Sequence, residues 1–179
     1  MILAACGGES DRITSDPVSV RGWINDVKGA QRATTMEMEV ARRQQLFQSA
    51  SIWVENTPLA SGGIAENGSF IVLDVPPRAA TIGVNATGAE DARIVLQNVP
   101  GNADVLIPDI VLEPGGAKVL DPKKILVRVP ADVDKPAPSG KTATVAGYTV
   151  PIIDTPVAQL MDRRDYPNPG GFRPLATVK

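Results

Sequence analysis

Residues 67–84 read NGSFIVLDVPPRAATIGV, and this stretch decides the expected fold. Two runs rich in Ile and Val, residues 69–75 and 79–84, lie on either side of Pro76-Pro77, and Asn67-Gly68 precedes the first run. Asn-Gly is a strong signal for a tight hairpin turn, and β-branched and aromatic residues favour strands. The stretch therefore predicts two successive β-strands, each bounded by a turn.

The same alternation of short apolar runs and turn residues extends over most of the chain. With 16 glycines and 16 prolines, the sequence is interrupted too often for long helices. Strands recurring about every 8–12 residues are typical of a sandwich or a barrel, because a sheet with one apolar face must pack that face against another layer. Further strands are expected over residues 18–27, 50–55, 92–96, 103–112 and 125–129.

One segment, residues 33–48, favours a helix. Thr34 and Glu37 have the spacing of a capping box, and Met36, Val40 and Phe47 would share one helical face. A strand is the alternative for the first half, because residues 36–40 also alternate between apolar and acidic types. In either case the Met and Phe side chains are expected in the core.

The chain is expected to contain one domain with a tail at each end. Residues 1–17 form a tether, residues 18–130 the domain, and residues 131–179 a Pro/Gly-rich extension with a short hairpin over 142–153. Residues 1–117 carry 8 Lys/Arg and 14 Asp/Glu, whereas residues 118–179 carry 10 and 6. Apart from the doublets Lys123-Lys124 and Arg163-Arg164, the basic residues of 118–179 are dispersed, which argues against nucleic-acid binding.

Several strand motifs resemble those of carboxypeptidase regulatory-like domains. They are Val20-Arg-Gly-Trp-Ile24, Ala50-Ser-Ile-Trp-Val54, Asn67-Gly-Ser-Phe70 with Val75-Pro76, and Val105 to Leu112. The resemblance covers roughly half the chain and implies an all-β fold: an antiparallel sandwich of the immunoglobulin or transthyretin-like type, with one inserted short helix and an irregular C-terminal extension. Two departures are the insertion at 30–49 and Arg78, where the family has glycine. Members of the family are mostly non-catalytic accessory modules on secreted or envelope proteins.

The chain begins Met1-Ile-Leu-Ala-Ala-Cys6, and Leu3 to Cys6 resemble a bacterial lipobox. In that family the peptidase cuts before the cysteine, whose sulfur carries a diacylglycerol. The basic and long apolar parts of a signal peptide are not present, so an ordinary free thiol is the alternative. No stretch reaches the 18 or so consecutive apolar residues of a membrane span. The sequence therefore predicts a lipid-anchored protein on the periplasmic or outer face of the bacterial envelope.

The chain contains no histidine and a single cysteine. Ser-His-Asp and Cys-His catalysis, His-ligated zinc and axial histidine ligation of haem all require an imidazole, so these chemistries are excluded. An internal disulfide is excluded as well. No cofactor, metal or enzymatic activity is expected, and a small hydrolase using unrecognised carboxylates is the least favoured hypothesis.

Two groups of residues are candidates for binding. Trp23 and Trp53 alternate with Ile24, Ile52 and Val54, so they face outward if the aliphatic residues face the core. The alternative is that a loop or tail covers them. The extension contributes Arg and aromatic residues of the types enriched at interface hot spots. These are Arg163, Arg164, Tyr166, Phe172 and Arg173.

Taken with the lipobox, these residues predict a non-catalytic structural or interaction subunit with protein partners in a membrane-associated assembly, such as a respiratory, photosynthetic, secretion or transport complex. Plain disorder is the alternative for the extension. A carbohydrate-binding module that uses the two tryptophans is the alternative function. A small-molecule ligand is not expected.

Overall fold

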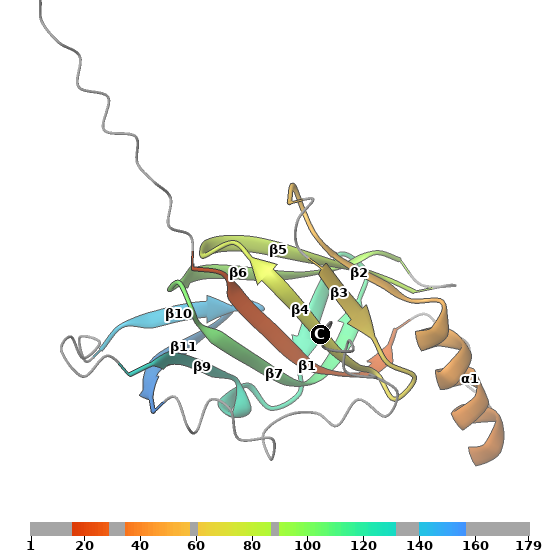
Figure 1. Ribbon diagram of the computed structural model, residues 1–179. Helices are drawn as coiled ribbons and strands as arrows, with labels where there is room; N and C mark the ends of the chain where they lie inside the picture. The colour runs from red at the N-terminus through yellow and green to blue at the C-terminus, as the bar shows by residue number, and fades with distance from the viewer. Residues whose placement is uncertain (1–15, 29–34, 58–60, 87–89, 132–139, 157–179) are drawn as a thin grey trace, which may run out of the picture.

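A computed structural model describes residues 16–28, 35–57, 61–86, 90–131 and 140–156 (Figure 1). Helix α1 (Met36–Gln48) follows the first strand, and a short 3-10 turn, η1 (Pro122–Lys124), precedes the ninth. The strands are β1 (Val18–Val27), β2 (Ser51–Val54), β3 (Ser61–Ile64), β4 (Ser69–Val75), β5 (Arg78–Asn85), β6 (Ala92–Val99), β7 (Asp104–Glu113), β8 (Gly116–Val119), β9 (Leu126–Pro130), β10 (Thr142–Val145) and β11 (Tyr148–Thr155).

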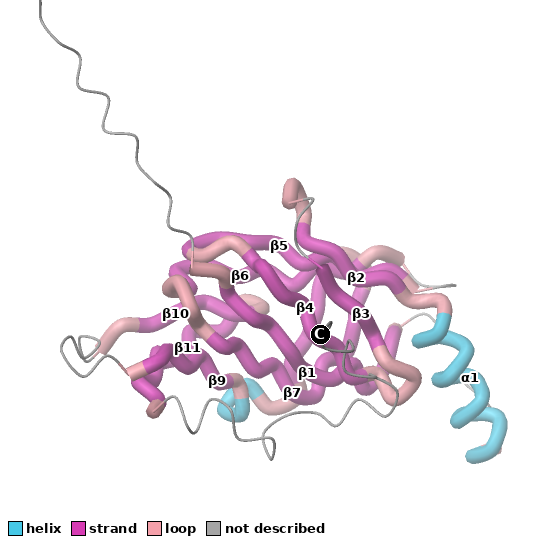
Figure 2. Tube along the Cα trace, in the orientation of Figure 1, coloured by secondary structure: helices cyan, strands magenta, loops and turns pink. Residues whose placement is uncertain are grey.

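Ten of these strands form a single mixed sheet in the order β2-β5-β6-β10-β11-β9-β7-β1-β4-β3, and β8 pairs with β7 beside this path. The pairs β1–β7 and β9–β11 are parallel. The two end strands lie next to each other, since a Cβ atom on Gly62 of β3 would stand 3.0 Å from Cγ2 of Ile52 in β2. The sheet is therefore nearly closed into a barrel (Figure 2).

The expected antiparallel sandwich is wrong, and the hairpin β10–β11 explains why. Strand β10 pairs with β6 and strand β11 pairs with β9. The hairpin thereby joins β2-β5-β6 to β9-β7-β1-β4-β3, which would otherwise be two separate pieces of sheet. Alternation in a sequence indicates which side of a strand is buried, but it does not indicate which strands are neighbours. The same pattern of alternation therefore fits a sandwich and a barrel equally well.

The inner face of the sheet forms a packed core. Val20 and Ile24 of β1, Ile94 of β6 and Val105 of β7 are fully buried, as alternation predicts. Apolar side chains from the strands and from the end of α1 belong to the same cluster. The interior of the barrel is thus filled by side chains.

The local elements largely follow the sequence signals. The Asn67-Gly68 turn forms between β3 and β4, with Gly68 at φ +83° and its N–H donating to the Ala65 carbonyl at 2.8 Å. The N-cap lies one residue later than expected: it is Thr35 instead of Thr34, and its hydroxyl accepts from the Met38 N–H at 3.3 Å. Strands β3 and β8 were not predicted from the sequence.

Both ends of the described chain lie at one end of the barrel. The Asn102 N–H donates to the Asp16 carbonyl at 3.2 Å, and the Ala131 N–H donates to the Thr155 carbonyl at 2.9 Å. The start of β1 and the end of β11 are neighbours in the sheet except for β7 and β9, which lie between them. We call this end, with Asp16 and Thr155, the terminal pole.

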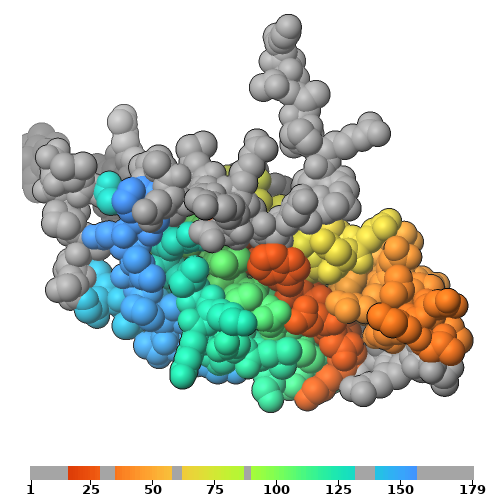
Figure 3. Space-filling model, turned by 90° about the horizontal axis from the view of Figure 1, so that it is seen from below, coloured from red at the N-terminus to blue at the C-terminus, as the bar shows by residue number. Residues whose placement is uncertain are grey.

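Helix α1 lies at the other end of the barrel. It packs where β1 finishes, since the Arg42 Nη2 atom is 3.5 Å from Oδ1 of Asp26. The Gln48 amide also donates to Glu66, in the β3–β4 turn, at 3.0 Å. We call this end, with α1 and the turn at 65–68, the helix pole. Figure 3 shows the orange surface of α1 at the opposite side of the molecule from the blue surface of β11.

Candidate functional site

Helix α1 is attached to the barrel through its last turn. Phe47 is 2% exposed, and Leu46 is buried as well. The Phe47 ring packs against the backbone of Gly68, where a Cβ atom would stand 3.0 Å from the ring. The guanidinium of Arg43 lies 5.8 Å from the centre of the same ring, within the range of a cation–π contact. The C-terminal end of the helix is therefore firmly held.

The N-terminal half of α1 projects away from the barrel (Figure 1). Met36 is 86% exposed, Met38 is 56% exposed and Val40 is 53% exposed. The prediction that the methionines of this segment belong to the core with Phe47 is therefore wrong. Met36, Val40 and Phe47 do lie along one stripe of the helix, but Met36 is 11 residues before Phe47, which is about 16 Å along the axis and beyond the barrel surface.

The polar residues of α1 leave the helix without net charge. Its two acidic residues, Glu37 and Glu39, are balanced by Arg42 and Arg43. The Arg42 Nε–H donates to Glu39 at 2.9 Å, and this hydrogen bond is the main cause that raises the pKa of Arg42. The N-terminal half of the helix thus presents apolar side chains beside acidic ones, of which Glu39 pairs with Arg42. We call Met36, Met38 and Val40 the helix tip.

A second surface lies on the outer face of β2, β5 and β6. Trp53 of β2 is opposite Gly83 of β5 in the antiparallel register. The indole lies across the Gly83 backbone, since a Cβ atom at that position would overlap Cε2 and Cζ2 of the ring. A glycine is therefore required here, and the indole takes the space that its side chain would fill. Trp53 remains 37% exposed.

Next to this tryptophan, an ion pair crosses β5. The Arg93 Nε–H of β6 donates to Oε1 of Glu55 at 2.6 Å. This hydrogen bond is the main cause that raises the pKa of Arg93. The Thr57 hydroxyl donates to the Glu55 carbonyl at 3.4 Å. These contacts hold the chain that follows β2 against the edge of β5.

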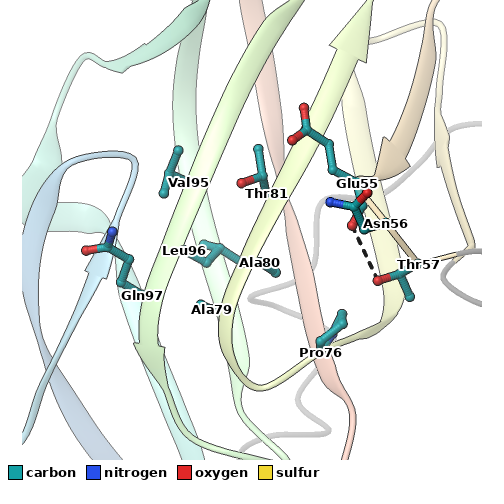
Figure 4. A pocket seen from close by; sticks show the side chains of 10 residues that line it. All are labelled: Glu55, Asn56, Thr57, Pro76, Ala79, Ala80, Thr81, Val95, Leu96 and Gln97. Carbon is teal, nitrogen blue, oxygen red and sulfur yellow. Dashed lines mark hydrogen bonds between the residues drawn. The ribbon is translucent and has the colours of Figure 1, made fainter.

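Beyond the ion pair the surface is hollowed (Figure 4). The hollow has a volume of about 400 Å³. Its base is made of small side chains, such as Ala79 and Val95, and polar groups of Asn56, Thr57 and Gln97 surround it. The outer face therefore carries an aromatic ring, a neutralised charge pair and a polar-edged hollow in succession. We call this arrangement the Trp53 strip.

The two tryptophans do not form one site. Trp23 is half-buried on β1, where it lies opposite Ser69 of β4. In the sheet, β4 and then β3 stand between β1 and the seam that faces β2. Trp53 and Trp23 thus belong to different parts of the outer surface, and the Trp53 strip does not include Trp23.

A buried charge cluster ties three neighbouring strands together near the terminal pole. Arg21 of β1 forms an ion pair with Asp104 of β7, and Nη2 of Arg128 in β9 lies 3.6 Å from the same carboxylate. All three side chains are largely buried. The cluster therefore links β1, β7 and β9 through side chains as well as through the backbone.

The other predicted site residues lie outside the described part of the chain. They are Cys6, Arg163, Arg164, Tyr166, Phe172 and Arg173. Within the described ranges, no three Cys, Asp or Glu side chains are grouped so that they could hold a metal ion. Among the same residues, no helix is long and apolar enough to cross a membrane.

Sequence reasoning missed the helix tip, although one signal for it was present. Met36 and Met38 are two residues apart, and residues at that spacing do not lie on the same side of a helix. At least one of them must therefore point away from a core contacted by Phe47. The hollow had no comparable signal, because its residues come from β5, β6, the segment after β2 and the turn before β5, which the sequence does not identify as neighbours.

Comparison of the chain with known protein families, curated proteins and solved structures finds no match. The resemblance of its motifs to carboxypeptidase regulatory-like domains stays a prediction.

Proposed function

We propose that this protein is a non-catalytic interaction subunit of a membrane-associated assembly, tethered to the bacterial envelope through a lipid on Cys6. In this proposal helix α1 is the element that binds a protein partner. The single observation that carries it is the helix tip: three apolar side chains exposed on a helix whose other end is fixed to the barrel.

The chemistry of α1 suits a protein groove. Methionine is enriched at protein interfaces, and its flexible thioether adapts to irregular surfaces. Met36 and Val40 are one turn apart and would act as neighbouring anchors of a helix lying in a groove. Helices that lie on anionic lipid usually carry an excess of Lys and Arg, whereas α1 has equal numbers of acidic and basic residues.

The position of α1 relative to the chain ends supports the same proposal. The tether enters the barrel at the terminal pole, and β1 then runs for 10 residues toward the helix pole. A strand of that length spans about 30 Å. A lipid on Cys6 would hold the terminal pole near the membrane, so that α1 faces a partner farther from the bilayer.

The C-terminal extension would meet the assembly on the membrane side. It follows β11, which ends at Thr155 in the terminal pole. We propose that Arg163, Arg164, Tyr166, Phe172 and Arg173 form this second contact, because arginine and tyrosine are enriched at interface hot spots. Deleting the residues after Pro156 removes this contact and leaves β11 intact.

The proposal is tested by gentle detergent extraction of native membranes, separation on a native gel and mass spectrometry of the proteins that migrate together. The wild-type chain and the control variant Leu120→Ser are expected to migrate with a large complex, because Leu120 is 57% exposed but lies outside α1. The double variant Met36→Ser/Val40→Ser is expected to migrate alone, near 18.8 kDa plus its lipid and detergent.

Continued migration of the double variant with the complex would contradict the role of α1. The anchor is tested separately with Cys6→Ser, which is expected to abolish labelling by a fatty-acid analogue. In the Met36→Ser/Val40→Ser background, which has lost the partner, Cys6→Ser is also expected to move the protein from the membrane fraction to the soluble fraction. A Cys6→Ser variant that stays labelled and membrane-bound would overturn the lipid anchor and leave the α1 proposal intact.

A further inference from the structure

The Trp53 strip is separate from the helix tip and has a different chemistry. It lies on the outer face of β2, β5 and β6, whereas the helix tip is apolar and projects from the helix pole. From its geometry we infer that the strip is a binding site for a neutral oligosaccharide, with Trp53 as the stacking platform and the hollow as the subsite for the next sugar ring.

The platform depends on the contact between Trp53 and Gly83. Because the indole lies across the glycine backbone, one face of the ring is against the sheet and the opposite face points outward. The ring is held in this position by the lack of a side chain at Gly83, and it keeps 37% of its surface exposed. A flat, fixed aromatic face packs well against the C–H face of a sugar ring.

The charges of the strip favour a ligand without net charge. Glu55 and Arg93 neutralise each other through the 2.6 Å contact. Both side chains remain partly exposed, so the second carboxylate oxygen and the remaining guanidinium N–H groups can bind hydroxyls. An anionic or cationic chain would find the charge that attracts it already neutralised within this pair. A polyhydroxylated neutral chain gains hydrogen bonds with the pair intact.

The hollow has the size and lining of a small-ligand subsite. Its volume of about 400 Å³ is within the range of small-molecule sites, about 300–1,000 Å³. Ala79 and Val95 provide an apolar base, while the amides of Asn56 and Gln97 provide donors and acceptors at its edge. The hollow is open to solvent and the polar part of its lining is the larger one, which suits a ligand with many hydroxyl groups.

The Trp53 strip also offers a direct spectroscopic test. The chain has two tryptophans, and Trp23 lies outside the strip. In the full-length protein with Trp23→Phe, the indole fluorescence comes from Trp53 alone. Titration of this protein with neutral gluco-, manno- and chito-oligosaccharides is expected to give a saturable change in emission for at least one series, and an anionic oligogalacturonate is expected to give none.

Two variants connect binding to the strip. Ala79→Phe fills the hollow without changing Trp53, because Ala79 is exposed at its base, and it is expected to weaken binding at least about tenfold. Trp53→Ala removes the fluorescent reporter, so its binding is measured by calorimetry. This variant is expected not to bind. Leu73→Phe adds a ring at an exposed position of β4 and serves as the matched control with unchanged affinity. Circular dichroism confirms that each variant is folded.

The inference is overturned if no neutral series changes the Trp53 emission at millimolar concentration, or if only the anionic probe binds. It is also overturned if Ala79→Phe binds as tightly as its parent, even where Trp53→Ala does not fold. None of these results depends on a protein partner, so this inference and the proposed role of α1 can fail separately.

Discussion

The hairpin β10–β11 and helix α1 are both additions to a simple succession of strands, yet they have opposite relations to the core. The hairpin places Ala143, Val145 and Val150 in the core and pairs with strands on both sides. The helix contributes Leu46 and Phe47 and leaves its tip exposed. The hairpin is therefore required for the fold, while most of the helix is not.

This difference separates residues that stabilise the folded chain from residues that do not. The buried Ala143, Val145 and Val150 of the hairpin are explained by the fold alone. A helix that keeps Met36 and Val40 in water gains nothing for the folded monomer from these side chains. The predictions below test this separation.

The largest effect is expected in the hairpin. Val145 is fully buried, so Val145→Asp would place a carboxylate in the core, which we expect to cost about 3–5 kcal/mol of the free energy of unfolding. The protein would lose its cooperative thermal transition or express as an insoluble chain. Thr149→Asp, at an exposed position of the same hairpin, is the matched control and should unfold like the wild type. A folded Val145→Asp protein with an unchanged urea midpoint would show that the hairpin does not join the sheet.

A smaller effect is expected at the base of α1, and hardly any at its tip. Phe47→Ala removes a buried ring and is expected to cost about 3 kcal/mol, whereas Met36→Ala should change the free energy of unfolding by less than about 0.5 kcal/mol. Urea denaturation followed by circular dichroism measures both. Equal losses for the two variants would mean that the helix packs along its whole length.

The smallest effect concerns an ion pair at the helix pole. The pKa of Glu113 is lowered, mainly by its hydrogen bond with Lys28. A lowered carboxylate pKa adds stability above the pKa of the unfolded state, and this contribution is lost as the pH falls through the folded-state pKa. Lys28→Met is therefore expected to lower the urea midpoint slightly at about pH 7 and to match the wild type at about pH 3. If the urea midpoints of Lys28→Met and the wild type still differ at about pH 3, the effect arises from another contact.

Local structure could be predicted from the sequence better than the arrangement of strands. The alternation of residues 69–75 and the Asn67-Gly68 turn both identify features that the structure contains, because they depend on neighbouring residues. The closure of the sheet depends on pairings between distant segments, such as Thr144 with Gln97 and Ile152 with Val127. Nothing in the local pattern of either strand specifies its partner.

The sequence was informative about the candidate sites to the same limited extent. The sequence singled out Trp53 through its alternation with Ile52 and Val54, both of which are buried. It gave no indication that Gly83 lies beneath the ring or that Arg93 reaches Glu55, because these contacts require the register of three strands. For α1, the shared stripe of Met36 and Phe47 was visible, but the distance from the tip to the barrel was not.

The proposed role of α1 is tested most directly by placing a photo-crosslinking amino acid at position 36, and at position 120 as the control, in the protein in its native membrane. Irradiation is expected to link position 36 to one defined component of the complex that migrates with the wild-type protein, while position 120 stays unlinked. A complex that forms normally but gives no adduct at position 36, or equal adducts at both positions, would contradict the claim that α1 binds the partner.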